Sequence, residues 1–135
     1  MKELKIKAED AQMNTVNDFI HSCLPDNCNE IIFNKIDLAV EEIFVNIAHY
    51  AYNPGEGDAW ISVSFDEEDR VLTIIFKDNG KEFNPIAKED PDVTLSAEER
   101  EIGGLGIFLT KKFMDSVNYE YKDNQNILTI RKKIV

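Results

Sequence analysis

A carboxylate at the end of an apolar, strand-like segment is the first feature of this sequence that could do chemistry. Asp78 ends the segment 71–78, and every second residue before it is apolar, namely Leu72, Ile74 and Phe76. Because side chains alternate along a strand, Asp78 should point inward with them. A buried carboxylate needs hydrogen-bond donors, and the exocyclic amine of adenine can supply one. Gly80 would let the backbone approach a flat ring, although Asp78-Asn79-Gly80 alone is also an ordinary turn sequence.

A glycine cluster further along the chain indicates an anion site. The segment Gly103-Gly104-Leu105-Gly106 precedes residues 107–109, where helical spacing resumes. Glycines at a helix N-terminus expose backbone N–H groups at the positive end of the helix dipole, which suits phosphate. The cluster is not a P-loop, because Lys111 lies too far along the chain. The same glycines could instead form a simple hinge.

A stripe of polar side chains follows the edge of the longest predicted helix. The helical wheel gathers an apolar arc, formed by Ile36, Ala39, Val40, Ile43, Phe44 and Ile47. Glu42, Asn46 and His49 fall together just outside one edge of that arc, where a pocket between helix and sheet would open. Glu42 could act as a general base on an attacking hydroxyl, and the side-chain oxygen of Asn46 could bind Mg²⁺. The alternative is a row of solvated helix residues. For His49 we favour a partly buried histidine with a satisfied hydrogen bond over a residue that lines the site.

The elements that must position these residues predict an α+β fold. Alternation and turn residues predict strands at about 2–8, 58–66, 70–77, 116–122 and 126–134, and helices at about 10–23, 28–51 and 105–114. Adjacent strands joined by short turns favour a mostly antiparallel sheet with helices on one face. The connection 79–102 is polar and long for a compact domain. It could close over a bound nucleotide, or it could be a simple disordered loop.

Length and charge limit the classes of function. The 135 residues suit one domain with its own core. The net charge of −11 argues against direct binding of nucleic acid, whose phosphates would be repelled. No apolar run is long enough to cross a bilayer, and the N-terminal residues do not resemble a signal peptide. We therefore expect a cytoplasmic protein with no membrane partner. Cys23 and Cys28 lack a matching pair of metal ligands and are expected to be free thiols.

Three motifs in this order resemble those of a known superfamily. Glu42-x-x-x-Asn46, then Asp78-x-Gly80-x-x-Phe83-x-Pro85, then the glycine cluster at 103–106 look like the asparagine box and the two glycine boxes of the GHKL ATPases. Gyrase, sensor histidine kinases and mismatch-repair ATPases belong to this superfamily. The form of the second motif and the short chain most closely resemble the bacterial anti-sigma factor serine kinases. The resemblance covers nearly the whole chain.

The resemblance implies a Bergerat fold. This is a single histidine kinase-like ATPase domain, here over residues 1–135, built as a two-layer α/β sandwich. Its sheet is mixed, mostly antiparallel, with about five strands and with helices on one face. ATP and Mg²⁺ would lie between sheet and helices, with Glu42 as catalytic base, Asn46 as metal ligand and Asp78 as the residue that recognises adenine. The candidate nucleotide contacts are Asn46, His49, Asp78, Gly80, Phe83, Gly103, Gly104, Leu105, Gly106 and Asn126.

Two positions depart from the family pattern. Gln125-Asn126 stands where the family usually has Gly-Thr at the start of the last strand. Asn126 shares the parity of Leu128, so it can face inward and its amide could replace the threonine hydroxyl beside adenine. Ile102 stands before the glycines, where the sigma-factor kinases can have a basic residue, and the nearest positive charge is that of Arg100. Mg²⁺ would then supply more of the charge that phosphoryl transfer needs.

The resemblance implies an ATP-dependent serine kinase in a partner-switching circuit. Its substrate would be a STAS-type antagonist domain, with a sigma factor as a possible second partner and a homodimer as a possible assembly. The two departures motivate an alternative, an ATP-dependent anti-sigma-type binding module without significant phosphoryl transfer. Weaker alternatives are a detached catalytic domain of a sensor histidine kinase and a remnant with an empty pocket.

Overall fold

Five strands and three helices make up the part of the chain that the structure describes, residues 1–87 and 104–134 of a computed structural model. The strands are β1 (Lys2–Lys7), β2 (Asp58–Asp66), β3 (Val71–Asp78), β4 (Ser116–Lys122) and β5 (Gln125–Lys133). The helices are α1 (Met13–Ser22), α2 (Glu30–Asn46) and α3 (Gly104–Phe113). Three short helical turns accompany them, namely η1 (Asp10–Gln12), η2 (Ile47–Ala51) and η3 (Pro85–Ala87).

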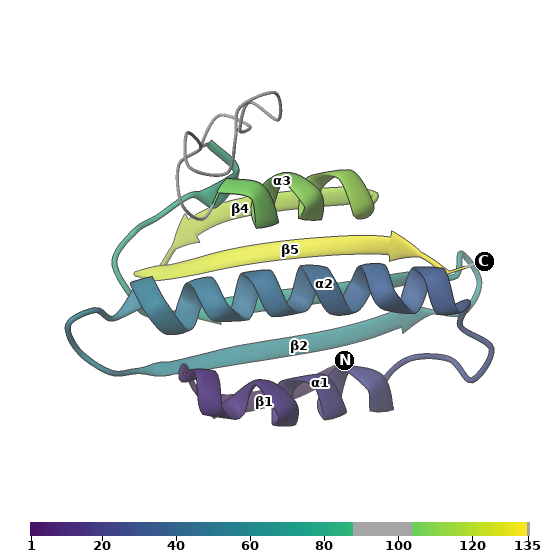
Figure 1. Cartoon of the computed structure of the whole chain (residues 1–135), viewed down its shortest axis with the longest axis horizontal. Coiled ribbons are helices and arrows are strands. Elements are labelled where there is room, and N and C mark those ends of the chain that lie inside the picture. The colour runs from purple at the N-terminus through teal and green to yellow at the C-terminus, as the bar shows by residue number, and fades with distance from the viewer. Residues whose placement is uncertain (88–103, 135) are drawn as a thin grey trace.

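The strands form one sheet in the order β1-β2-β3-β5-β4, and each of its four pairings is antiparallel. Figure 1 shows α1, α2 and α3 on the same face of this sheet, with α2 across its middle. The predicted α+β class, with five strands and helices on one face, is thus confirmed. The sheet was expected to be mixed but mostly antiparallel, and its described pairings are all antiparallel.

The core lies between α2 and the middle strands. On β3, Leu72, Ile74 and Phe76 are buried as alternation predicted, and each is 1% exposed. The predicted apolar arc of α2 is also buried, with Ile36, Ala39, Val40 and Phe44 at 0% exposure. Packing of this arc on the sheet fixes the rotation of α2, and it therefore fixes which of its polar residues lie at the border of the core.

The ends of α2 differ from the prediction of one continuous helix over 28–51. Asn29 has an extended backbone and caps the N-terminus, since its Oδ1 accepts from Ile31 N at 2.7 Å and from Ile32 N at 3.4 Å. At the other end the chain continues from Asn46 into η2, a single π-helical turn. Turns of this kind are rare and occur often at functional sites.

No helix in the described ranges combines the length and the apolar character needed to cross a membrane.

Candidate functional site

A pocket opens between the end of α2 and the sheet. It encloses about 510 Å³ of empty space, a volume that includes the solvent at its open mouth. Its apolar walls come from α2 and η2, from the sheet and from α3, and include Ile43, Ile47, Phe76, Ile107 and Leu128. Its polar lining includes Asn46, Asp78, Tyr119 and Asn126. An apolar slot with a few convergent polar groups is the usual form of a site for an aromatic ring.

Asp78 lies at the base of this pocket and is 5% exposed, so the inward orientation predicted from its parity is confirmed. Its Oδ1 accepts two hydrogen bonds, from Gly80 N and from Asn126 Nδ2, both at 2.9 Å. Within the described residues no hydrogen bond reaches Oδ2. Burial raises the pKa of Asp78, and the bonds from Asn126 and Gly80 oppose this shift. The second carboxylate oxygen is therefore the one available to a ligand.

Asn126 lies directly opposite Asp78 in the β3–β5 ladder and is 7% exposed. Its Nδ2 donates to Asp78 Oδ1 and to Lys81 O at 2.9 Å, and more weakly to Gly80 O at 3.5 Å. Its Oδ1 accepts from Phe83 N at 3.1 Å and from the Tyr119 hydroxyl at 2.5 Å. The inward orientation expected for Asn126 is confirmed, and its partners are protein groups.

The turn that follows Asp78 is attached to the end of η2. Lys81 N donates to Ala51 O at 3.1 Å, and Asn79 N donates to the Tyr52 hydroxyl at 2.7 Å. Gly80 packs so closely on Ala51 that a Cβ at Gly80 would collide with the Ala51 carbonyl group. Glycine is required here because two backbone segments meet without room for a side chain. We expected Gly80 to let the backbone approach a flat ring, and the close neighbour of Gly80 in this structure is the backbone of Ala51.

The predicted polar stripe on α2 is only partly assembled at the pocket. Asn46 lines it, and its Nδ2 donates to Glu42 Oε1 at 3.3 Å. Burial raises the pKa of Glu42, the bond from Asn46 lowers it, and the charge of Glu41 raises it further. The Glu42 carboxylate packs against Gly106 near the start of α3, where an added Cβ would overlap it. The first turn of α3 therefore approaches Glu42 because Gly106 lacks a side chain.

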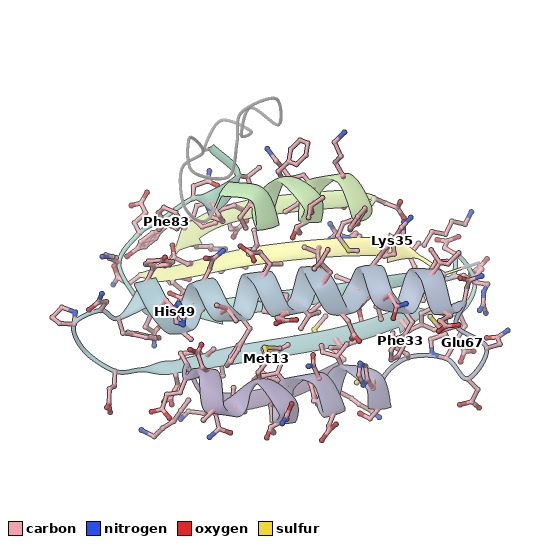
Figure 2. The ribbon with its side chains drawn as sticks, in the orientation of Figure 1. Met13, Phe33, Lys35, His49, Glu67 and Phe83 are labelled. Atoms are coloured by element: carbon pink, nitrogen blue, oxygen red, sulfur yellow. The ribbon has the colours of Figure 1, made fainter. Side chains whose placement is uncertain are left out.

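His49 does not line the pocket. It is 47% exposed at its side chain, and its Nε2 pairs with Asp10 Oδ2 of η1 at 2.7 Å. Figure 2 labels His49 beside α2, whereas Phe83 lies beside the start of α3. The hydrogen bond that we favoured for His49 is present, but the side chain is exposed and not partly buried as expected.

The remaining predicted contacts are placed as follows. Phe83 lines the mouth of the pocket and is 52% exposed. Gly104 and Leu105 begin α3. Gly103 lies outside the described residues, as does most of the predicted connection 79–102.

Two tyrosines were missed, Tyr119, which lines the pocket, and Tyr52, which holds the turn after Asp78. Tyr52 donates to Asp58 O at 2.6 Å while it accepts from Asn79 N. Tyr119 donates to Asn126, and burial raises the pKa of Tyr119, which keeps its hydroxyl protonated. Tyr119 has the inward parity of its strand, which was a usable signal. Tyr52 follows a helix end, and its sequence context gave no comparable sign.

The arrangement suits a purine nucleotide. The apolar slot can take the ring, Asp78 Oδ2 can accept from an amine on it, and the start of α3 offers backbone N–H groups to phosphate. Asn46 Oδ1 accepts no hydrogen bond from the described residues and could bind a cation. No group of three or more His, Cys, Asp or Glu side chains within residues 1–87 and 104–134 is placed to hold a metal.

Comparisons with known proteins agree with this geometry. The serine/threonine-protein kinase BtrW of Bordetella bronchiseptica is 27% identical over 110 residues, which cover 82% of this chain and 77% of BtrW. The serine-protein kinase RsbW of Listeria monocytogenes is 31% identical over 97 residues, 69% of this chain and 61% of RsbW. The anti-sigma F factor of Clostridium kluyveri is 30% identical over 99 residues, 73% of this chain and 68% of that protein.

A solved structure shares the fold. It contains the RsbU and RsbW domains of a Mycobacterium tuberculosis protein, and it matches 99% of this chain with a TM-score of 0.66 at 12% identity. The matched part is 33% of that longer chain.

The family assignment comes from a match over most of the sequence. A family model described as the histidine kinase-like ATPase domain matches residues 6–132. This range includes the polar stripe of α2, Asp78 and its turn, the glycine cluster and Asn126. The chain belongs to the histidine kinase-like ATPase domain family.

Proposed function

We propose that this protein binds ATP and phosphorylates a serine or threonine on a small antagonist protein, as an anti-sigma-type kinase. The observation that carries the proposal is the state of Asp78, a buried carboxylate with one oxygen held by protein donors and the other available at the base of an apolar pocket. The names of the relatives, serine-protein kinases and an anti-sigma factor, support the kind of partner.

The adenine ring would lie against the apolar walls, with its exocyclic amine donating to Asp78 Oδ2. The triphosphate would then extend along α2 toward the first turn of α3, whose backbone N–H groups suit anions. Asn46 would hold Mg²⁺ through its Oδ1, with phosphate oxygens and water as the other ligands. Bound there, Mg²⁺ would offset the charge of the transferring phosphoryl group.

Glu42 would act on the acceptor hydroxyl. Its raised pKa makes it a stronger base than an exposed glutamate, and Asn46 and Gly106 fix its position. The serine oxygen would form a bond to the γ-phosphorus while the bond from that phosphorus to the β–γ bridging oxygen breaks. The serine proton would pass to the Glu42 carboxylate, and ADP would leave.

The partner would be a STAS-type antagonist domain, and a sigma factor would be a second partner of the same circuit. We propose a homodimer as the working assembly, and the cytoplasm as its location, since ATP and transcription factors are found there. The net charge of −11 argues against a direct contact with nucleic acid.

The test is transfer of labelled phosphate. Wild type and Glu42→Ala are incubated with γ-labelled ATP, Mg²⁺ and a cognate antagonist domain. We expect label on the antagonist with wild type and a loss of about 100-fold or more with Glu42→Ala, because general-base catalysis contributes about that much. His49→Ala, which changes an exposed residue outside the pocket, is the matched control. Equal transfer by Glu42→Ala and wild type would exclude the role of Glu42.

The second candidate is a module that binds a partner when loaded with ATP and transfers no phosphate. It is favoured by the basic residues of α3, which lie in its last turn and not beside the start where phosphate would sit. Partner binding that needs ATP and proceeds equally with a non-hydrolysable analogue, with no label transferred, would support this module over the kinase.

A further inference from the structure

We infer that Asn126 and Tyr119 are positioning residues that orient Asp78 toward the adenine ring of ATP, and that Asn126 does not contact this ring itself. This inference rests on the proposed binding of ATP. It differs from the expectation drawn from the sequence, in which the Asn126 amide takes the place of a hydroxyl beside adenine.

The first argument counts the hydrogen bonds that an amide can make. A carboxamide has two N–H groups and two lone pairs on its oxygen. In Asn126 the two N–H groups face Asp78 Oδ1 and Lys81 O at 2.9 Å, and the oxygen accepts from Phe83 N and the Tyr119 hydroxyl. All four positions are occupied by protein groups, so a purine could bind this amide only by displacing one of them.

The second argument fixes which way the amide points. Phe83 N is a backbone N–H and can only donate, whereas Asp78 and the Lys81 carbonyl accept. Rotating the amide by 180° would set Nδ2 against the Phe83 N–H and Oδ1 against the Asp78 carboxylate. Both contacts would be repulsive, so the network permits one orientation.

The third argument concerns what this orientation does to Asp78. Nδ2 of Asn126 and the backbone N–H of Gly80 both bind Oδ1, from the opposite strand and from the following turn. The carboxylate plane is thereby held with Oδ2 toward the pocket. Asn126 also binds Lys81 O and Phe83 N, so the backbone beside the base is held by the same amide.

Tyr119 supports Asn126 from the edge strand. Its hydroxyl donates to Asn126 Oδ1, which keeps that oxygen away from Asp78. Tyr121, two residues along, has the same parity and is also half-buried, but its hydroxyl makes no hydrogen bond to the described residues. Tyr121→Phe is therefore a control for Tyr119→Phe, because each removes one hydroxyl from the same face of β4.

The experiment is a double-mutant cycle read by ligand binding. Calorimetry measures ATP binding to wild type, Asn126→Ala, Asp78→Asn and the double variant. We expect Asn126→Ala to weaken ATP binding by about 10- to 100-fold, the usual effect of losing a hydrogen bond to a charged group, and to change it less than twofold in the Asp78→Asn background. Tyr119→Phe should weaken ATP binding by about 2- to 10-fold, and Tyr121→Phe should leave it unchanged.

A second ligand separates positioning from general damage to the fold. The triphosphate of purine riboside lacks the exocyclic amine, so it makes no use of Asp78. Asn126→Ala should weaken binding of this ligand much less than it weakens binding of ATP, whereas a merely loosened pocket would weaken binding of both ligands equally. If Asn126→Ala does not fold, Tyr119→Phe is taken through the same cycle and the same two ligands.

Additive losses in the Asp78→Asn background would show that Asn126 does not act through Asp78 and would overturn the inference. Unchanged ATP binding by both Asn126→Ala and Tyr119→Phe would overturn it as well. Failure of the proposed function is distinguishable, because wild type itself would then show no binding of ATP.

Discussion

Replacing Asp78 by asparagine separates what this carboxylate does for the ligand from what it does to the fold. Both protein hydrogen bonds end on Oδ1, and an asparagine oxygen in the same place can accept both of them. The substitution therefore breaks no contact within the protein. It removes a charge from a side chain that is 5% exposed, and it turns the ligand-facing oxygen into an N–H₂ donor.

Asp78→Asn should weaken ATP binding but stabilise the nucleotide-free protein. Adenine loses one charge-assisted hydrogen bond, about 1.5–3 kcal/mol, and meets a donor in its place, so ATP should bind at least about tenfold more weakly. Without nucleotide the variant should be more stable. Burial raises the pKa of folded Asp78 above its unfolded value, so ionisation disfavours the folded state at neutral pH. This cost is absent below the unfolded pKa and appears as pH rises through the folded pKa.

The assay is thermal unfolding of nucleotide-free protein across pH, together with calorimetry of ATP binding. Asp78→Asn should melt higher than wild type near pH 7, by about 3–5 °C for each kcal/mol gained in a domain of this size. The two melting curves should converge below about pH 4, where the carboxylate is protonated in the unfolded chain as well. A lower melting temperature for Asp78→Asn near pH 7 would refute the reasoning, because the donors would then more than offset the burial of the charge.

Four further predictions follow from the site. Gly106→Ala should slow phosphate transfer by about 10- to 100-fold, because the new Cβ displaces the Glu42 carboxylate; an unchanged rate of label transfer would contradict this. Phosphate transfer by wild type should fall as pH drops through the raised pKa of Glu42, since a protonated base cannot accept the serine proton; a pH-rate profile that is flat over this range would exclude Glu42 as base. Tyr52→Phe should lower the free energy of unfolding in urea by about 1–3 kcal/mol, as it loses hydrogen bonds to Asp58 O and Asn79 N; stability equal to wild type would show that water replaces both. His49→Ala should bind ATP within about twofold of wild type by calorimetry, because the only hydrogen bond of its side chain to the described residues is to Asp10; a larger loss would place it in the site.

Alternation along the strands made much of the sheet predictable. The strands β2 and β4 have the predicted bounds of 58–66 and 116–122. The inward directions of Asp78 and Asn126 follow from the same period of two. Once β3 and β5 pair in register, these two side chains must meet, since they lie opposite each other.

Contacts between distant segments could not be predicted in this way. The hydroxyl of Tyr52 binds a backbone group 27 positions away, and no local pattern signals such a pair. A wheel drawn at the α-helical pitch grouped His49 with Glu42. The π-helical turn that starts at Ile47 changes that pitch, and His49 meets η1 instead. The position of Asn126 along its strand predicted that its side chain faces inward. The groups that bind its amide depend on the path of residues 80–83, which the sequence pattern does not predict.

The attachment of η2 to the turn after Asp78 fixes how many residues can lie between the end of α2 and that turn's contact at Ala51. Asn46 ends α2, and five residues later Ala51 receives the backbone bond from Lys81. One residue more or fewer within η2 would move Ala51 and Tyr52 out of register with that turn. Insertions and deletions should therefore be absent from this short stretch among functional relatives, whereas the exposed hairpin 67–69 between β2 and β3 is free to vary in length.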